Sequence, residues 1–89
     1  MVLKVLFFAS VREAIGCDAI ELDLGSLPDR DRPQTIDSKW LLDFLQQKYP
    51  EIVPLCPSVS LAVNKSYIRG VVTLNDGDEI ALIPPLGGG

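Results

Sequence analysis

Two short runs, one near each end of the chain, are apolar on both faces of an extended backbone, and they constrain the fold more than any other feature. In residues 2–9 the odd and even positions are almost all apolar, and Lys4 is the one charged residue. Residues 79–83 repeat this pattern, with Glu79 as their one charged residue. Strands covered on both faces lie in the interior of a sheet. We therefore expect the first and last strands to lie side by side, in parallel, in the middle of one sheet.

The segment after the first run predicts a short helix and a second strand. Ser10 and Glu13 have capping-box spacing, and Gly16 can take the left-handed conformation that ends a helix. Residues 20–24 then alternate apolar with acidic side chains, which is typical of a half-buried strand. We expect this strand to pair with the first one in antiparallel fashion.

One longer amphipathic helix is expected in the middle of the chain. It begins near Thr35 or Asp37, both suitable N-caps, and ends before Pro50. Its apolar positions recur every four residues, at Leu41, Leu45 and Tyr49. This spacing gives the helix one face to bury against a sheet.

The order of these elements indicates the fold class. Residues 59–63 and a shorter extended segment at 67–72 supply further strands before the last one. With 89 residues there is room for one domain and one core. We predict an α+β fold, the ubiquitin-like β-grasp. It has a mixed sheet, one main helix packed across it and a short helix after the first strand.

Composition excludes several classes of function. The net charge is −4, without a basic cluster, which disfavours nucleic-acid binding. No apolar run is long enough to cross a bilayer, so we expect no membrane association. The chain has no histidine, and Cys17 and Cys56 are too few to form a zinc site or a disulfide framework. We expect a cytoplasmic protein with reduced, incidental thiols, no bound metal and no catalysis of its own.

The chain ends in a proline pair, Pro84 and Pro85, followed by Leu86, Gly87, Gly88 and Gly89. Prolines lack amide donors, so they end sheet pairing and direct the tail outward. Three glycines cannot stabilise a fold, but they can pass through a narrow channel and present a terminal carboxylate. Fully extended, the last four residues reach about 13–14 Å. We expect a β-grasp domain over residues 1–85 and a flexible tail over 86–89, although a frayed terminus has the same composition.

Four segments give the chain a specific resemblance. They are LFFASVREAIG at residues 6–16, LLDFLQQKYP at 41–50, SLAVN at 60–64 and DGDEIALIPPLGGG at 76–89. Together they resemble the small, sulfur-carrying subunits of molybdopterin synthase. The closing motif is the most specific of the four. Gly87 is a departure, because that family usually has serine or threonine before the final glycine pair.

The resemblance implies a role for the terminal carboxyl group of Gly89. In that family a separate adenylyltransferase uses ATP to form a transient glycyl adenylate, and a sulfurtransferase then converts it to a thiocarboxylate. The sulfur is donated to precursor Z, cyclic pyranopterin monophosphate, within a heterotetramer of two small and two large subunits. The resemblance therefore implies a non-catalytic sulfur carrier in molybdenum cofactor biosynthesis. It implies no permanently bound cofactor.

Two points stay open at the level of sequence. Leu6 and Phe8 form part of a partner interface only if the helix leaves their sheet face uncovered. Similar glycine tails also occur in sulfur carriers for thiamine synthesis or tRNA thiolation, and in ubiquitin-like protein modifiers that form isopeptide bonds. A plain binding module with an inert tail is a further alternative.

Overall fold

The computed structural model describes residues 1–28 and 33–85. Its strands and helices, in chain order, are β1 (Val2–Phe7), α1 (Ala9–Ile15), β2 (Ala19–Asp23), α2 (Ser38–Lys48), β3 (Ser60–Val63), β4 (Ser66–Tyr67) and β5 (Glu79–Ile83). Single 3-10 turns lie at Leu24–Ser26, Pro50–Ile52 and Cys56–Ser58. The described elements form an α+β fold with the predicted order.

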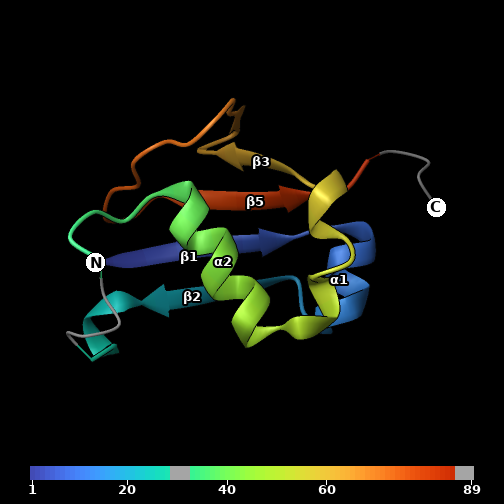
Figure 1. The fold of residues 1–89 in the computed structure, drawn as a ribbon, viewed down its shortest axis with the longest axis horizontal. Coiled ribbons are helices and arrows are strands. Elements are labelled where there is room, and N and C mark those ends of the chain that lie inside the picture. The colour runs from blue at the N-terminus through green and yellow to red at the C-terminus, as the bar shows by residue number, and fades with distance from the viewer. Residues whose placement is uncertain (29–32, 86–89) are drawn as a thin grey trace.

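The sheet has the strand order β2-β1-β5-β3-β4 (Figure 1). Strands β1 and β5 pair in parallel, with Val5 opposite Ile80 and Phe7 opposite Leu82. Strand β2 pairs with β1 in antiparallel fashion, and β3 pairs with β5 in the same way. The predicted central pair and early antiparallel pair are therefore both confirmed. Strand β5 is therefore paired along both of its edges.

Helix α2 crosses one face of this sheet and closes the core (Figure 1). Leu41 and Leu45 are almost completely buried, as the four-residue spacing predicts, whereas Tyr49 is half-buried. The sheet contributes the buried side chains Leu3, Val5, Phe7, Leu22, Ile80 and Leu82. Alternation along the strands therefore leaves the even-numbered residues of β1 on the other face.

Helix α2 begins after Asp37, and the alternative start at Thr35 is wrong. The Asp37 carboxylate accepts a hydrogen bond of 2.8 Å from the Trp40 amide, which is one of the unpaired donors of the first turn. Ser38, the first helical residue, is buried and donates its amide to the Val72 carbonyl at 2.9 Å. This contact attaches the start of the helix to the chain that precedes β5.

Replacing Asp37 with alanine is expected to lower the free energy of unfolding by about 1 kcal/mol, because the Trp40 amide loses its acceptor. Asp37→Asn is the matched control, since an asparagine carbonyl accepts the same bond. Urea denaturation of the three proteins measures the difference. Equal stability of Asp37→Ala and the wild type would contradict the capping role.

The predicted capping box at the first helix is wrong. Helix α1 begins at Ala9, its N-cap is Phe8, and no side chain caps it. The Phe8 carbonyl already accepts hydrogen bonds from the amides of Val11 and Arg12, so the turn starts two residues earlier than predicted. The prediction for Gly16 is confirmed, since this residue has a φ of 91°.

The predicted extended segment at 67–72 is also wrong beyond its first residue. Strand β4 has two residues, and it follows a tight turn in which Asn64 and Lys65 have φ angles of 51° and 73°. A two-residue turn of this hand fixes the register of β4 against β3. At Gly70, where φ is 69°, the chain bends away from the sheet.

Candidate tail exit and docking face

Strand β5 leads directly to the predicted tail. It ends at Ile83, which lies opposite Ser60 at the start of β3. Pro84 is buried and Pro85 is exposed, so the described chain reaches the surface within two residues of the sheet. The end of β5 lies at the same end of the sheet as the end of β1 and helix α1 (Figure 1). The predicted tail residues Leu86, Gly87, Gly88 and Gly89 lie outside the described residues.

The sheet face opposite α2 carries one continuous row of side chains across all five strands. Each member lies opposite the next in the strand registers, in the order Ala19, Leu6, Ala81, Ala62 and Tyr67. All five side chains are apolar or aromatic, and Tyr67, at one end of the row, is the largest. The Tyr67 residue is 69% exposed. The helix therefore leaves the face that contains Leu6 uncovered.

Two more apolar residues extend this row toward the tail. Ile83 is two residues beyond Ala81 on β5, on the same face, and it is partly exposed. Phe8 follows β1 and is 43% exposed. We call Leu6, Phe8, Tyr67 and Ile83 the open-face patch; Ala81, which lies next to Leu6 in the row, is only 9% exposed. The structure brings together the two residues selected from the sequence, Leu6 and Phe8, and adds Tyr67 and Ile83, which sequence reasoning missed.

Charged residues limit the open-face patch at its other end. Lys4 lies opposite Glu21 on one side and Glu79 on the other, one position before Val5 and Ile80. A lysine between two carboxylates keeps this part of the face hydrated. Lys4 therefore separates the apolar surface around Leu6, at the end of the sheet where β5 leads into the tail, from Val2, which is 40% exposed at the other end.

The acidic turn before β5 has a structural role. Asp78 accepts hydrogen bonds from the Asn75 amide at 2.8 Å and from the Asn64 side chain at 3.0 Å. The Val2 amide donates to the Asp76 carboxylate at 2.7 Å. These bonds tie the starts of β1 and β5 to the turn after β3, at the opposite end of the sheet from the tail.

The two cysteines lie beside the core. Cys17 and Cys56 are free and half-buried against the core. Burial raises the pKa of the Cys56 thiol, so this group is protonated and weakly nucleophilic at neutral pH.

Residues 1–28 and 33–85 contain no cluster of three or more potential metal ligands. Within the same ranges, no helix has the length and hydropathy needed to span a membrane.

Comparison with known proteins places this geometry in a family. The ThiS family matches residues 5–89 of the chain. The molybdopterin synthase sulfur carrier subunit of Mycobacterium tuberculosis is 38% identical over 92 residues, which cover 98% of this chain and 96% of that protein. The similarity therefore extends over both proteins almost from end to end.

Two solved structures share the fold and more than a quarter of the sequence. One is described as a protein–protein complex of subunits 1 and 2 of molybdopterin-converting factor from Helicobacter pylori. It has a TM-score of 0.69 and 26% identity, with full coverage of both chains. The other is the small archaeal modifier protein 1 of Methanosarcina acetivorans, with a TM-score of 0.73 and 26% identity over 99% of this chain and 96% of that one.

Proposed function

The chain belongs to the ThiS family, and we propose that it is the sulfur carrier subunit of a molybdopterin synthase, with the carboxyl group of Gly89 as the sulfur-bearing group. The position of β5 is the observation that supports this best. This central strand is held on both sides, and it ends in two prolines beside an uncovered apolar face. A rigid strand next to a docking surface is suited to aim a short tail at a partner's active site.

The proposed chemistry takes place on the tail and in the partners. A carboxylate is a poor electrophile, so it first attacks the α-phosphate of ATP in an adenylating enzyme and releases pyrophosphate. A sulfurtransferase then delivers sulfur to the acyl adenylate, AMP leaves, and a thiocarboxylate remains on Gly89. The thiocarboxylate sulfur next bonds to cyclic pyranopterin monophosphate on the large subunit, and water then hydrolyses the acyl–sulfur bond, so that the sulfur stays on the pterin and Gly89 returns to a carboxylate. In this scheme the chain carries sulfur in the cytosol and does not itself catalyse a step.

The open-face patch is the proposed contact with the large synthase subunit. Its apolar residues lie at the tail end of the sheet, so a protein docked there is close to the exit at Pro85. Exposed aromatic side chains such as Tyr67 and Phe8 are frequent energetic centres of interfaces. Pro84 and Pro85 position the tail, and residues Leu86 to Gly88 are the spacer that reaches into the partner.

Two other functions of the same fold remain alternatives. A protein modifier would use the same glycyl adenylate but join Gly89 to lysine side chains, and the similarity to the small archaeal modifier protein favours this second candidate. A carrier for thiamine or tRNA thiolation would carry the same thiocarboxylate. The relative from Mycobacterium tuberculosis, similar over its whole length, favours the molybdopterin branch.

Intact-mass analysis of the protein purified from its own cells tests the proposal. We expect a fraction of the chains to show one sulfur in place of one oxygen, and fragmentation to place the sulfur on Gly89. Cells without the adenylating enzyme provide the control, because their protein is expected to carry only oxygen. Lysine-linked adducts on other proteins, without any sulfur on Gly89, would support the modifier instead.

A further inference from the structure

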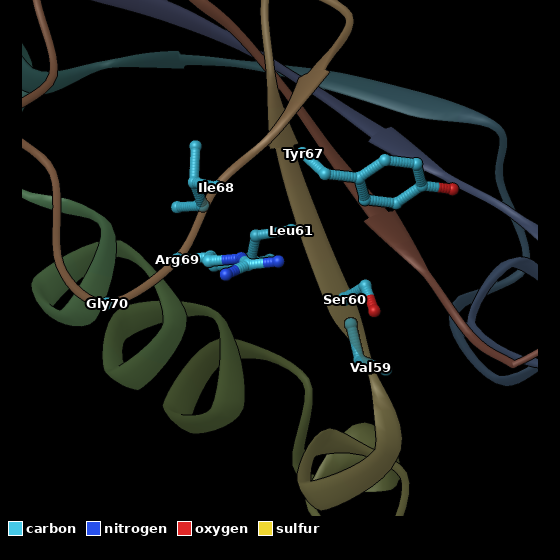
Figure 2. A pocket seen from close by; sticks show the side chains of 7 residues that line it. All are labelled: Val59, Ser60, Leu61, Tyr67, Ile68, Arg69 and Gly70. Atoms are coloured by element: carbon cyan, nitrogen blue, oxygen red, sulfur yellow. The ribbon is translucent and has the colours of Figure 1, made fainter.

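A shallow pocket of about 480 Å³ lies at the β4 edge of the sheet, outside the open-face patch apart from Tyr67 (Figure 2). It is lined by Val59, Ser60, Leu61, Tyr67, Ile68, Arg69 and Gly70. The pocket exists because β4 is shorter than β3. The last two residues of β3 pair with β4, whereas its first two residues, Ser60 and Leu61, do not belong to that ladder.

The first half of β3 is therefore a short open strand edge. The Ile68 amide donates to the Leu61 carbonyl at 3.1 Å, and after this bond the chain bends away at Gly70. In the described ranges, the Leu61 amide has no backbone acceptor in return. A strand edge with a free amide is suited to pair with an extended peptide.

The charge of the pocket indicates which kind of peptide it can bind. Arg69 is exposed and extends from the loop after β4 toward β3 (Figure 2), and none of the seven lining residues is acidic. Over residues 1–28 and 33–85, the one ion pair joins Arg12 to Asp18, so Arg69 is available to an outside carboxylate. A guanidinium group binds carboxylates in a bidentate geometry. On a chain with a net charge of −4, it is a local site for an acidic group.

The pocket is also continuous with the proposed interface. Tyr67 belongs both to the open-face patch and to the pocket lining, and Ser60 lies opposite Ile83 of that patch. A protein that covers the patch therefore reaches the pocket by passing over Tyr67.

We propose that an acidic, extended segment of the large synthase subunit lies in this pocket, with a backbone carbonyl that accepts from the Leu61 amide and a carboxylate that pairs with Arg69. This proposal rests on the proposed function, because it assigns the pocket to the same docking partner. It adds a charged, strand-pairing contact to the apolar one. The contact would fix the rotation of the carrier on its partner and thus the direction of the tail.

The test compares binding of the large subunit by the wild type and by Arg69→Glu at several salt concentrations. We expect Arg69→Glu to weaken binding about tenfold or more and to reduce the salt dependence of the affinity. Lys39→Glu is the matched control, since Lys39 is an exposed cation on α2, across the sheet from the open-face patch. We expect the Lys39→Glu protein to bind the large subunit with the affinity of the wild type. Residue-specific hydrogen exchange should show a slower Leu61 amide in the wild-type complex.

The outcomes separate this inference from the function on which it rests. If Arg69→Glu binds like the wild type while Leu6→Asp loses binding, the pocket proposal is wrong and the docking face stands. An equally fast Leu61 amide in the free and bound wild type overturns the strand pairing. If the wild type itself does not bind the large subunit, the inference and the proposed function both fail.

Discussion

Removal of Gly88 and Gly89 is expected to abolish sulfur loading and molybdoenzyme activity in cells, while the free energy of unfolding stays unchanged. The last residue of the described core is Leu82, and a glycine has no side chain to bury, so we expect the deletion to leave the stability of the domain unchanged. The proposed chemistry, by contrast, needs a carboxylate on an unbranched terminus that reaches the adenylating enzyme. The loss should therefore reach the background level of a strain that lacks the gene. Molybdoenzyme assays and intact-mass analysis of the truncated chain measure it.

Two variants make this result specific to the terminal carboxyl group. Addition of one bulky residue after Gly89 should block adenylation as completely as the deletion does, because the reactive carboxylate is displaced and carries a side chain. Gly87→Ser places the residue type usual in related tails before the intact glycine pair, and we expect it to keep full activity. Survival of molybdoenzyme activity in the deletion strain would disprove the sulfur-carrier function.

Most of the fold could be predicted from the sequence because the strong signals are periodic. A strand that is apolar on both faces has few positions other than the middle of a sheet, which is why the parallel pairing of β1 and β5 was predictable. The same argument applies to the buried face of α2 at Leu41 and Leu45. Periodicity also placed Leu6 on the sheet face opposite Val5 and Phe7, although it did not show that helix α2 leaves this face uncovered.

The features that could not be predicted depend on local geometry or on strand register. Ser10 and Glu13 have the spacing of a capping box, but the backbone turns at Phe8 and Ala9 before that box can form. Tyr67 joins the open-face patch because a two-residue turn fixes β4 opposite β3, and no side-chain pattern in the sequence shows that register. Alternation along the last strand places Ile83 on the face opposite Ile80 and Leu82, and this was a usable signal for Ile83 once the helix was known to cover the other face.

The pocket at the β4 edge could not be predicted from the sequence either. It arises from the difference in length between two paired strands: β4 ends at Tyr67, and the chain then bends at Gly70, where φ is positive. From sequence alone, residues 67–72 read as one extended segment, which would have paired with the whole of β3 and left Arg69 inside a strand. Short strands are the elements that periodicity identifies least well, since two residues show no period.

Leu45→Asp is expected to unfold the domain, with a loss of about 4 kcal/mol or more in the free energy of unfolding. Leu45 is fully buried in the middle of α2, against a core that includes Leu3 and Phe7. A carboxylate there loses its hydration without gaining a partner, and the leucine side chain leaves a cavity. A domain of this size has little stability in reserve, so we expect the variant to be unfolded in the absence of denaturant.

Circular dichroism and urea denaturation measure this effect. Lys39→Asp on the same helix is the matched control, since Lys39 is exposed and the substitution introduces the same side chain. Its stability should stay within about 0.5 kcal/mol of the wild type. A melting curve for Leu45→Asp that matches the control would mean that this face of α2 does not pack on the sheet. In that case the sheet would lack its cover on this side, and the contrast between a covered face and the open-face patch would lose its basis.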